Sequence, residues 1–538
     1  MKRIITIFML LVFINMNAQW VADTNVNTLV ADSESGDMKA IGTSGGLTYV
    51  VFWKVVSAPT NYELRLQVLD IDGTQLLGND GLLVSDQIPM STFTYIWNIT
   101  IDENDNLYIG ATGSGGGEPA YAFKLDTAGN HLWGTNGVNV GSGFSVTFLP
   151  LSSGETIVSW WPGTEGLMQK FDTSGAAIWG ATQSIEEGTN DTVPANIFEL
   201  SDGGYVMVFH SLTFGINSIL YGQRYNSLGE AQWVNPTQLA DYGTVFISNY
   251  SGLQDGDNVY MGYMASPGSR FDSFLQRINP DGTLPWGING SDFDTNQTDY
   301  EMNTQISFEP GSQNIWAICT YTNTSQSEKG EYVQKFDKDS GDRLLTENAK
   351  EIYPIGSEKV HAGPLHLKNN APLFLLKSGV DNGVSPTTLG GILLEDNGNI
   401  EIDEDILSAA TFNANKSRIH YTKPVDSQGV VVFIENKGGG AKIYAHTIIA
   451  EILSIGDNEI DSNKISYTNP VTNLLSIISE NELSSIRVVS ILGQVIMEAK
   501  ISAKTEIEIE TSSWNSGMYF VTIETSEGDK GQIKVIKK

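Results

Sequence analysis

The stretch RYNSLGEAQW, residues 224–233, decides the fold of this chain because variants of it recur along the sequence. Its pattern is a basic residue, an apolar residue, and Asp or Asn, with Gly three and Trp seven positions after that Asp or Asn. Asp or Asn starts a tight turn, Gly supplies the positive φ that the turn needs, and Trp follows on the next strand. Full copies begin at Lys124, Lys170, Arg224 and Arg277, and degenerate copies start their turns at Asp70, Asp337 and Glu395.

A second marker precedes these stretches, and it consists of a short polar or glycine turn followed by an apolar strand. The eight turns are Ser44-Gly45-Gly46, Asn104-Asp105-Asn106, Ser153-Gly154-Glu155, Asp202-Gly203-Gly204, Gly256-Asp257-Asn258, Ser312-Gln313-Asn314, Asn369-Asn370-Ala371 and Ser427-Gln428-Gly429. A spacing of about 49 to 60 residues is typical of one four-stranded propeller blade with variable loops. The sequence therefore predicts an all-β protein with an eight-bladed β-propeller. Seven blades remain the alternative, since the first pattern occurs only seven times.

The N-terminus is predicted to supply the missing eighth copy. The segment that starts at Trp20 is similar to the one that starts at Trp133. We expect residues 20–29 to form the last strand of the final blade, beside a strand near 442–453, which removes an unpaired sheet edge. The body, over residues 20–455, resembles secreted bacterial propellers built from such repeats. That loose family has no single shared activity, so the resemblance implies a fold and not a function.

The first residues have the order of a Sec signal peptide. Lys2 and Arg3 precede an apolar stretch at 4–14, and small Ala18 follows as the predicted cleavage point. The stretch is too short for a membrane anchor, and no other segment reaches the length of a transmembrane helix. We therefore predict a signal peptide at 1–18, the propeller at 19–454, a polar linker at 455–462 and a last domain at 463–538.

The last domain carries the most specific pattern in the chain. Its landmarks are Asn469, Pro470, Gly493, Gly517, Tyr519, Lys534, Lys537 and Lys538. This segment resembles the type A C-terminal sorting domain of the type IX secretion system, except that Thr468 stands where the family usually has Pro. The resemblance implies a small Ig-like sandwich that the outer-membrane translocon recognises. It also implies a location on the cell surface or outside the cell, after Sec export to the periplasm.

Composition excludes several kinds of partner and site. The chain has 63 acidic and 31 basic side chains and a formal charge of −32, which argues against binding nucleic acid or anionic lipid. Its single cysteine, Cys319, cannot form an intramolecular disulfide or a cysteine-based metal site. Cys319 lies in an apolar run and is predicted to be a buried thiol.

The sequence predicts no catalytic, cofactor-binding or metal-binding residue. Residues 42–46 match the nucleophile-elbow pattern, but a strand follows them where that motif needs a helix. His361 and His366 are the closest histidine pair, and five positions apart on a strand they face opposite sides. Asp70-Ile71-Asp72-Gly73 and the segment 337–342 have oxygen ligands at alternating spacing that could hold calcium. Turn formation is the favoured interpretation of both segments, because neither has the bidentate Glu of a full calcium loop.

Binding is the leading functional hypothesis, with a glycan or a protein as ligand, because propellers present loops around a central funnel. Trp160 and Trp161 point to opposite sides of one predicted strand, so at least one of them could stack on a sugar ring. The longest interruptions, at 112–120, 264–273 and 322–331, are the predicted contact loops. The alternative is a glycan-active extracellular enzyme, a hydrolase or lyase, with its active site in the funnel.

Overall fold

The computed structural model describes residues 20–32, 35–57, 61–89, 95–213, 218–246, 250–425, 427–449, 465–490, 495–526 and 530–538. Within these ranges the chain consists of strands and their connections, and none of the described residues is helical. The chain divides into two compact units, Met1–Ala450 and Glu451–Lys538. The predicted signal peptide and the predicted linker at 455–462 lie outside the described residues.

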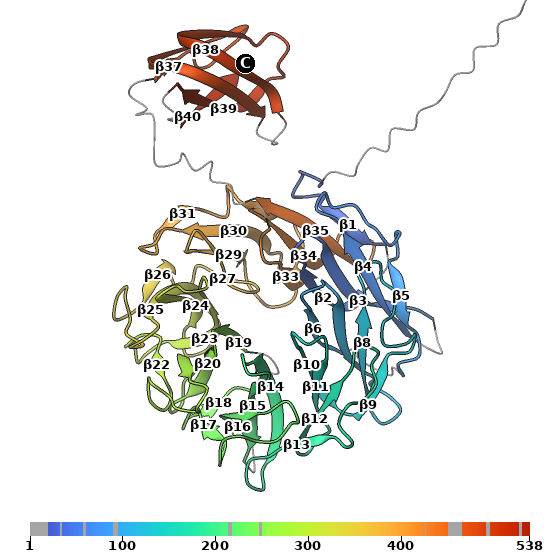
Figure 1. Ribbon diagram of the computed structural model, residues 1–538. Helices are drawn as coiled ribbons and strands as arrows, with labels where there is room; N and C mark the ends of the chain where they lie inside the picture. Colours follow the sequence, from blue (N-terminus) through green and yellow to red (C-terminus); the bar gives the residue numbers. More distant parts are fainter. Residues whose placement is uncertain are drawn as a thin grey trace, which may run out of the picture. The chain divides into compact units, whose positions relative to one another are not determined.

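The first unit is all-β and β-propeller-like, with small antiparallel sheets set around a ring (Figure 1). Three four-stranded sheets begin it. The first has the order β2 (Ser35–Gly42), β3 (Thr48–Val55), β4 (Tyr62–Leu69), β5 (Leu82–Ser85). The second has the order β6 (Tyr95–Ile101), β7 (Leu107–Thr112), β8 (Pro119–Leu125), β9 (Val138–Ser142). The third has the order β10 (Phe144–Pro150), β11 (Thr156–Trp161), β12 (Gly166–Phe171), β13 (Gln183–Ile185).

A nine-stranded sheet follows, and a short strand joins its two parts. The first part contains β14 (Asp191–Glu199), β15 (Tyr205–Leu212), β16 (Ser218–Tyr225) and β17 (Thr237–Gln238). The second part contains β19 (Ser251–Asp255), β20 (Asn258–Ser266), β21 (Asp272–Ile278) and β22 (Ser291–Asp292). The joining strand β18 (Gly243–Thr244) pairs with β16 on one side and with β20 on the other.

Three more sheets complete the ring. One contains β23 (Tyr300–Ser307), β24 (Asn314–Thr322), β25 (Lys329–Asp337) and β26 (Lys350–Tyr353). The next contains β27 (Lys359–His361), β28 (His366–Lys368), β29 (Ala371–Ser378), β30 (Thr388–Leu394), β31 (Ile400–Ile402) and β32 (Ser408–Ala410). The last contains β33 (Lys416–Tyr421), β34 (Gln428–Asn436), β35 (Ala441–Ile449) and β1 (Thr28–Ala31).

The N-terminal segment closes the ring, as predicted. β1 pairs antiparallel with β35, with Thr28 opposite Ala445, so strands from the two ends of the unit share one sheet. The paired strand starts at Thr28, later in the chain than the expected residues 20–29, and the residues before it form a lead-in. In that lead-in, the indole N–H of Trp20 donates to the backbone oxygen of Ile71 over 2.8 Å.

The repeated tryptophans pack against the turn glycine of the next sheet. A side chain on Gly175, whose φ is +85°, would meet Trp133 at 2.8 Å. In the same way, a side chain on Gly229 would meet the ring of Trp179. Trp20 lies in the same way against Gly73. It therefore packs on a turn glycine like Trp133, as its sequence similarity to that tryptophan predicted. The glycine therefore serves twice, since it allows the turn and leaves room for the neighbouring ring.

A buried glutamine recurs on the third strand and was not noticed in the sequence. It lies directly before the basic residue of the pattern in Gln169, Gln223, Gln276 and Gln334, and before Val68 of a degenerate copy in Gln67. In Gln169 the side-chain oxygen accepts the backbone N–H of Lys170 at 2.8 Å and of Trp179 at 3.2 Å. The glutamine amide hydrogen-bonds to backbone groups at the point where the strand ends and the turn begins. These hydrogen bonds explain why the glutamine is buried.

The second unit is a small antiparallel sheet structure with its own core. It contains β36 (Ile465–Tyr467), β37 (Leu474–Ser490), β38 (Val495–Glu510), β39 (Gly517–Thr525) and β40 (Lys530–Lys537), in the order β36-β37-β39-β40 with β38 also paired to β37. Leu475, Val488, Val521 and Val535 are fully buried in this core. Alternate residues of the strands supply these side chains, so one side of each strand faces inward.

Candidate functional site

The connections of the first unit fall into two groups. In each sheet the turns after the first and third strands lie at one end of the antiparallel strands, and the remaining connections lie at the other end. We call these ends the turn side and the loop side. Both repeated sequence markers lie on the turn side, and the predicted contact loops at 112–120, 264–273 and 322–331 lie on the loop side.

On the turn side, the repeated carboxylates bind their own backbone. Asp126 Oδ1 accepts the backbone N–H groups of Ala128 and Asn130 at 2.9 and 2.8 Å. Asp172 is bonded in the same way, and these bonds, led by the one from the Ser174 hydroxyl, lower its pKa. These side chains hold turns and have little left to offer a ligand.

The two segments considered as calcium sites, at Asp70 and Asp337, also use their aspartates to bind their own backbone. Asp70 Oδ1 accepts the backbone N–H groups of Asp72 and Thr74 at 3.0 and 2.7 Å. Asp337 Oδ1 accepts those of Asp339 and Ser340 at 3.0 and 2.8 Å. Both aspartates therefore cap their own turns, which accounts for the spacing of acidic residues there.

The loop side carries a continuous line of rings that crosses several sheets. Its members lie on β6, β10, β11 and β15 and in the connection between β18 and β19. In order, they are Tyr95, Trp97, Phe144, Trp161, Phe246, His210 and Tyr250, which we call the ring line. Neighbouring ring centroids are 4.6 to 6.4 Å apart, the range of favourable aromatic contact.

The ring line is most exposed at Phe246 and buried at its Tyr250 end. Phe246 is 44% exposed, and the rings from Tyr95 to Trp161 are half-buried. His210 is fully buried, and Tyr250 is 6% exposed. The line therefore offers aromatic surface to solvent while its inner end is fixed by packing.

The two adjacent tryptophans named from the sequence are separated by the strand. Trp160 is 2% exposed and packs with Val158 and Phe171 in the core. Trp161 is half-buried, lies in the ring line, and donates its indole N–H to Thr164 O at 2.8 Å. Of the pair, Trp161 is the one placed where a ligand could reach it.

The inner end of the ring line reaches two adjoining cavities. They have volumes of about 410 and 590 Å³. Both are lined by Tyr250, Ser251, Gln305 and Pro364, so the two hollows share a border. We call them the inner cavities, because β19 and β23, which help to line them, are among the strands nearest the centre of the ring (Figure 1).

The lining of the inner cavities combines polar and apolar groups and is nearly free of acidic ones. Asn303, Thr304 and Gln305 come from β23, and Ser251 comes from β19. Among the described lining residues of both cavities, Glu309 is the single carboxylate. Lys423 lines the larger cavity as well, and the other polar lining groups are amides, hydroxyls and imidazoles, which suit hydroxyl-rich ligands.

One lining residue is held by a buried acid. His361 lines the smaller cavity, and its Nδ1 lies 2.7 Å from Oε1 of Glu331, which is fully buried. The backbone N–H of His361 donates to the second carboxylate oxygen at 3.0 Å. Burial raises the pKa of Glu331, and the imidazole acts in the opposite direction. His366 does not join this pair, since its ring lies by the backbone oxygen of Tyr421.

Most of these residues were missed in the sequence. A weak signal exists, because an aromatic residue stands at or just before the start of several innermost strands, as in Tyr95, Phe144 and Tyr250. Phe246, His361 and Glu331 gave no local signal, since their neighbours in space come from other sheets.

Among the sorting landmarks, Asn469 connects the first and last segments of the second unit by hydrogen bonds. Asn469 Oδ1 accepts the N–H of Ile536 at 2.8 Å, and its Nδ2 donates to Lys534 O at 3.0 Å. Tyr519 packs on Trp514, and Lys537 is 9% exposed. Gly517 begins β39, Lys538 follows β40, and Pro470 lies in the connection between β36 and β37, whereas Gly493 lies outside the described residues.

Residues 466–538 match the family described as "Secretion system C-terminal sorting domain". This segment is thus a type IX secretion C-terminal sorting domain, as the sequence pattern suggested. Such a domain directs export by the type IX system to the cell surface or the extracellular space and is recognised by that system.

The body resembles solved structures only distantly. An ulvan lyase of a polysaccharide lyase family, bound to -[GlcA(1-4)Rha3S]-, is 12% identical, with 79% of this chain and 96% of that chain covered and a TM-score of 0.42. A puromycin hydrolase is 12% identical over 78% and 61%, with a TM-score of 0.40. Drosophila Semaphorin 1b is 10% identical over 68% and 88%, with a TM-score of 0.37. At these values the likenesses assign no function.

Two further comparisons bear on the chain. No curated protein matches its sequence. Across the part of the chain that the structure describes, no helix has the length and apolar character needed to cross a membrane.

Proposed function

We propose that this protein, exported by the type IX secretion system, binds a neutral glycan chain on the loop side of its body. The carrying observation is that the ring line leads from solvent-exposed Phe246 through His210 to Tyr250, which lines the inner cavities. An extended ligand would contact the partly exposed rings from Tyr95 to Phe246 and end among the hydrogen-bonding groups of the inner cavities, whereas fully buried His210 would support Phe246 from within.

The chemistry of the two parts suits a saccharide. Sugar rings have apolar C–H faces that pack on aromatic side chains, and half-buried rings such as Trp97 and Trp161 are already ordered before binding. Asn303 and Gln305 in the cavity lining can pair with hydroxyl groups. The formal charge of −32 would oppose an anionic polysaccharide, so the ligand is assigned as neutral.

The proposal includes an eight-bladed body. Six sheets supply one blade each, and the nine-stranded sheet supplies two, β14–β17 and β19–β22, with β18 as the joint. The alternative of seven blades would treat these nine strands as one blade, about twice the usual four. For the second unit we propose an Ig-like sandwich, supported by the pairing of long β37 with both β38 and β39.

The test is binding of the full exported chain to a panel of neutral polysaccharides, measured by calorimetry. We expect Trp161→Ala and Phe246→Ala each to weaken binding about tenfold, which corresponds to about 1.4 kcal/mol. Tyr467→Ala removes a 37% exposed ring from the second unit and should leave affinity unchanged. If both ring-line variants bind as tightly as the parent, the proposal is wrong.

One observation favours a second candidate, a glycan-active hydrolase or lyase. His361 lines the smaller cavity with its Nδ1 held by Glu331, and an imidazole oriented by a carboxylate is a common general base. Under this candidate, the chain releases products from one of the bound polysaccharides. His361→Gln should then abolish product formation and leave binding within twofold, whereas the binding module yields no product in either protein.

A further inference from the structure

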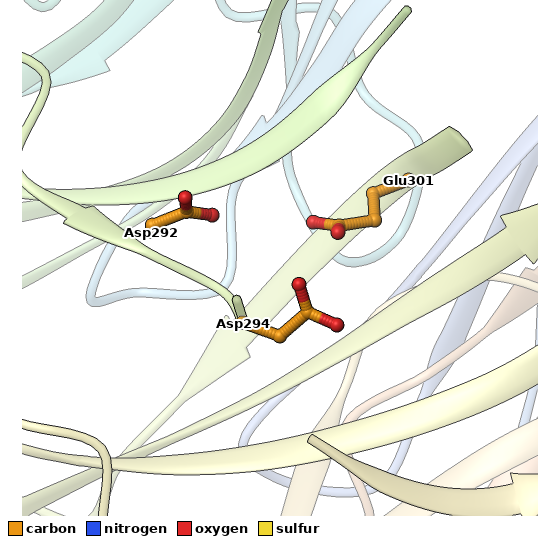
Figure 2. Close-up of side chains that lie close together, drawn as sticks. All are labelled: Asp292, Asp294 and Glu301. Atoms are coloured by element: carbon orange, nitrogen blue, oxygen red, sulfur yellow. The ribbon is translucent and has the colours of Figure 1, made fainter. Parts of the chain in front are cut away.

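Three carboxylates converge at a join between two sheets (Figure 2). Asp292 ends β22, Asp294 lies two residues later, and Glu301 lies on β23 of the next sheet. One oxygen from each lies within 4.8 Å of the others. Glu301 is fully buried, Asp294 is 1% exposed, and Asp292 is half-buried.

Glu301 has an unused oxygen that is directed into this group. Its Oε2 accepts the backbone N–H of Ser273 at 3.0 Å, but its Oε1 has no hydrogen-bond partner among the described residues. Figure 2 shows the Glu301 carboxylate turned toward Asp292 and Asp294. A fully buried oxygen without a partner is costly, so its position calls for a ligand atom or a proton.

A fourth acid next to the group repeats this feature. Asp272 is 1% exposed, and its Oδ1 also lacks a hydrogen-bond partner within the described part of the chain. Its negative charge acts on Asp292, whose pKa is raised to about 6, mainly by burial and then by Asp272. The pKa of Glu301 is raised as well, by burial and by the charge of Asp294.

Neighbouring cations offset the three converging acids only in part, since Arg343 acts on Asp292 and Asp294 through space. Arg270 pairs with Asp272 and donates to Asn296 O at 2.8 Å. Arg343 donates to the backbone oxygen of Asp292 at 3.0 Å and to the side chain of Glu347 at 2.8 Å. Neither guanidinium has a hydrogen bond to the carboxylates of Asp292, Asp294 or Glu301 among the described contacts.

We propose that Asp292, Asp294 and Glu301 bind a calcium ion. Calcium accepts oxygen ligands at about 2.3–2.6 Å, so two oxygens on one ion can lie up to about 5 Å apart. The three oxygens lie within 4.8 Å of one another, so small side-chain shifts bring them to calcium distances. Calcium is favoured because magnesium demands a strict octahedral shell at about 2.0–2.1 Å and zinc prefers nitrogen and sulfur ligands.

The ion would join two sheets beside the inner cavities. Asp292 belongs to the sheet with β20 and β21, and Glu301 belongs to the sheet with β24. Three residues after Glu301 on β23, Thr304 lines the smaller cavity. Calcium would thus fix the start of β23, a role that does not depend on which ligand the cavities take.

The test uses the full exported chain after removal of metal with EDTA. We expect calcium to raise its melting temperature by several degrees, since an ion that binds only the folded state stabilises it. Terbium should also bind and luminesce, because the Tyr321 hydroxyl lies 2.6 Å from Asp294 Oδ2 and can sensitise it. Calcium should displace this signal.

Asp292→Asn and Glu301→Gln should each weaken calcium binding at least tenfold and remove most of the luminescence. Asp292→Asn alters a half-buried position, so it tests the site even if Glu301→Gln fails to fold. Asp337→Asn changes an acidic turn on the turn side and should keep the full response. The proposal is contradicted if calcium leaves the melting temperature unchanged, or if Asp292→Asn responds like the parent. An unresponsive parent that gains stability from Glu301→Gln would indicate a proton shared between Asp294 and Glu301 instead.

Discussion

The turn side and the loop side use similar residues for different purposes. On the turn side, Asp172 caps its own turn, and Trp179 packs on Gly229 of the next sheet. On the loop side of the same sheet, Trp161 is half-buried and contacts Phe246, which is 44% exposed. The comparison teaches that residues which recur along the chain build the ring, whereas residues that depart from the recurrence form the partly exposed ring line, for which we propose ligand binding.

Removing the N-terminal closure should have the largest effect on the turn-side architecture. Deletion of residues 20–31 from the exported chain removes β1, its ladder with β35 and the Trp20 contact with Gly73. We expect the free energy of unfolding to fall by about 5 kcal/mol or more, and the exposed β35 edge to promote association. Urea unfolding and light scattering measure both effects. A deletion that stays monomeric and changes stability by less than about 0.5 kcal/mol would show that the ring closes elsewhere.

Removing one repeated tryptophan should have the next largest effect. Trp133 is 3% exposed and lies against Gly175, so Trp133→Ala leaves a cavity between two sheets. The expected loss is about 3–5 kcal/mol in the free energy of unfolding, measured with urea. Trp133→Phe keeps part of the ring and should lose less. A loss below about 1 kcal/mol for the alanine variant would mean that the ring does not hold the sheets together.

Acid should act at the closure through His446 on β35. This side chain is 6% exposed, and burial lowers its pKa to about 4, with a backbone hydrogen bond to Val21 acting in the opposite direction. An unfolded histidine takes up a proton below about pH 6.5, whereas buried His446 stays neutral until the pH nears 4. The contribution of neutral His446 to the free energy of unfolding is therefore complete above about pH 6.5 and is lost as the pH falls toward 4.

At about pH 5 the expected loss is about 2 kcal/mol for this histidine. Urea unfolding near pH 7 and pH 5 measures it. His446→Gln should reduce the difference between the two pH values by that amount. His420 and His366, whose pKa values are also lowered by burial, to about 3 and about 4, remain in both proteins. An unchanged pH difference in the variant would show that His446 is protonated in the folded state.

The sequence was most informative where the chemistry is local. Asp126, Gly129 and Trp133 lie within one turn and the start of the next strand, and Trp20 was identified by likeness to that unit. The loop side depends on contacts between residues far apart in the chain, such as His210 with Phe246. Strand alternation separated Trp160 from Trp161 but could not say which one lies outward, because that depends on the neighbouring sheet.

The buried acids could not be predicted from the sequence for the same reason, because they meet only through contacts between distant parts of the chain. Glu301 lies on a strand of ordinary appearance, and its relation to Asp292 arises only when β22 and β23 come together from different sheets. The acidic segments that drew attention in the sequence, at Asp70 and Asp337, are turn caps. Spacing of oxygen ligands along the chain therefore indicated turns, whereas the group with unused oxygens comes from packing.

The division of labour between the two sides can be tested with one pair of tryptophan variants. Melting temperature and affinity for a bound neutral polysaccharide are measured for Trp161→Ala and Trp179→Ala in the full exported chain. We expect Trp161→Ala to bind about tenfold more weakly with a nearly unchanged melting temperature. Trp179→Ala should melt well below the parent and, at a temperature where it is folded, bind normally. Loss of binding in folded Trp179→Ala, or a large fall in melting temperature with intact binding in Trp161→Ala, would contradict the account.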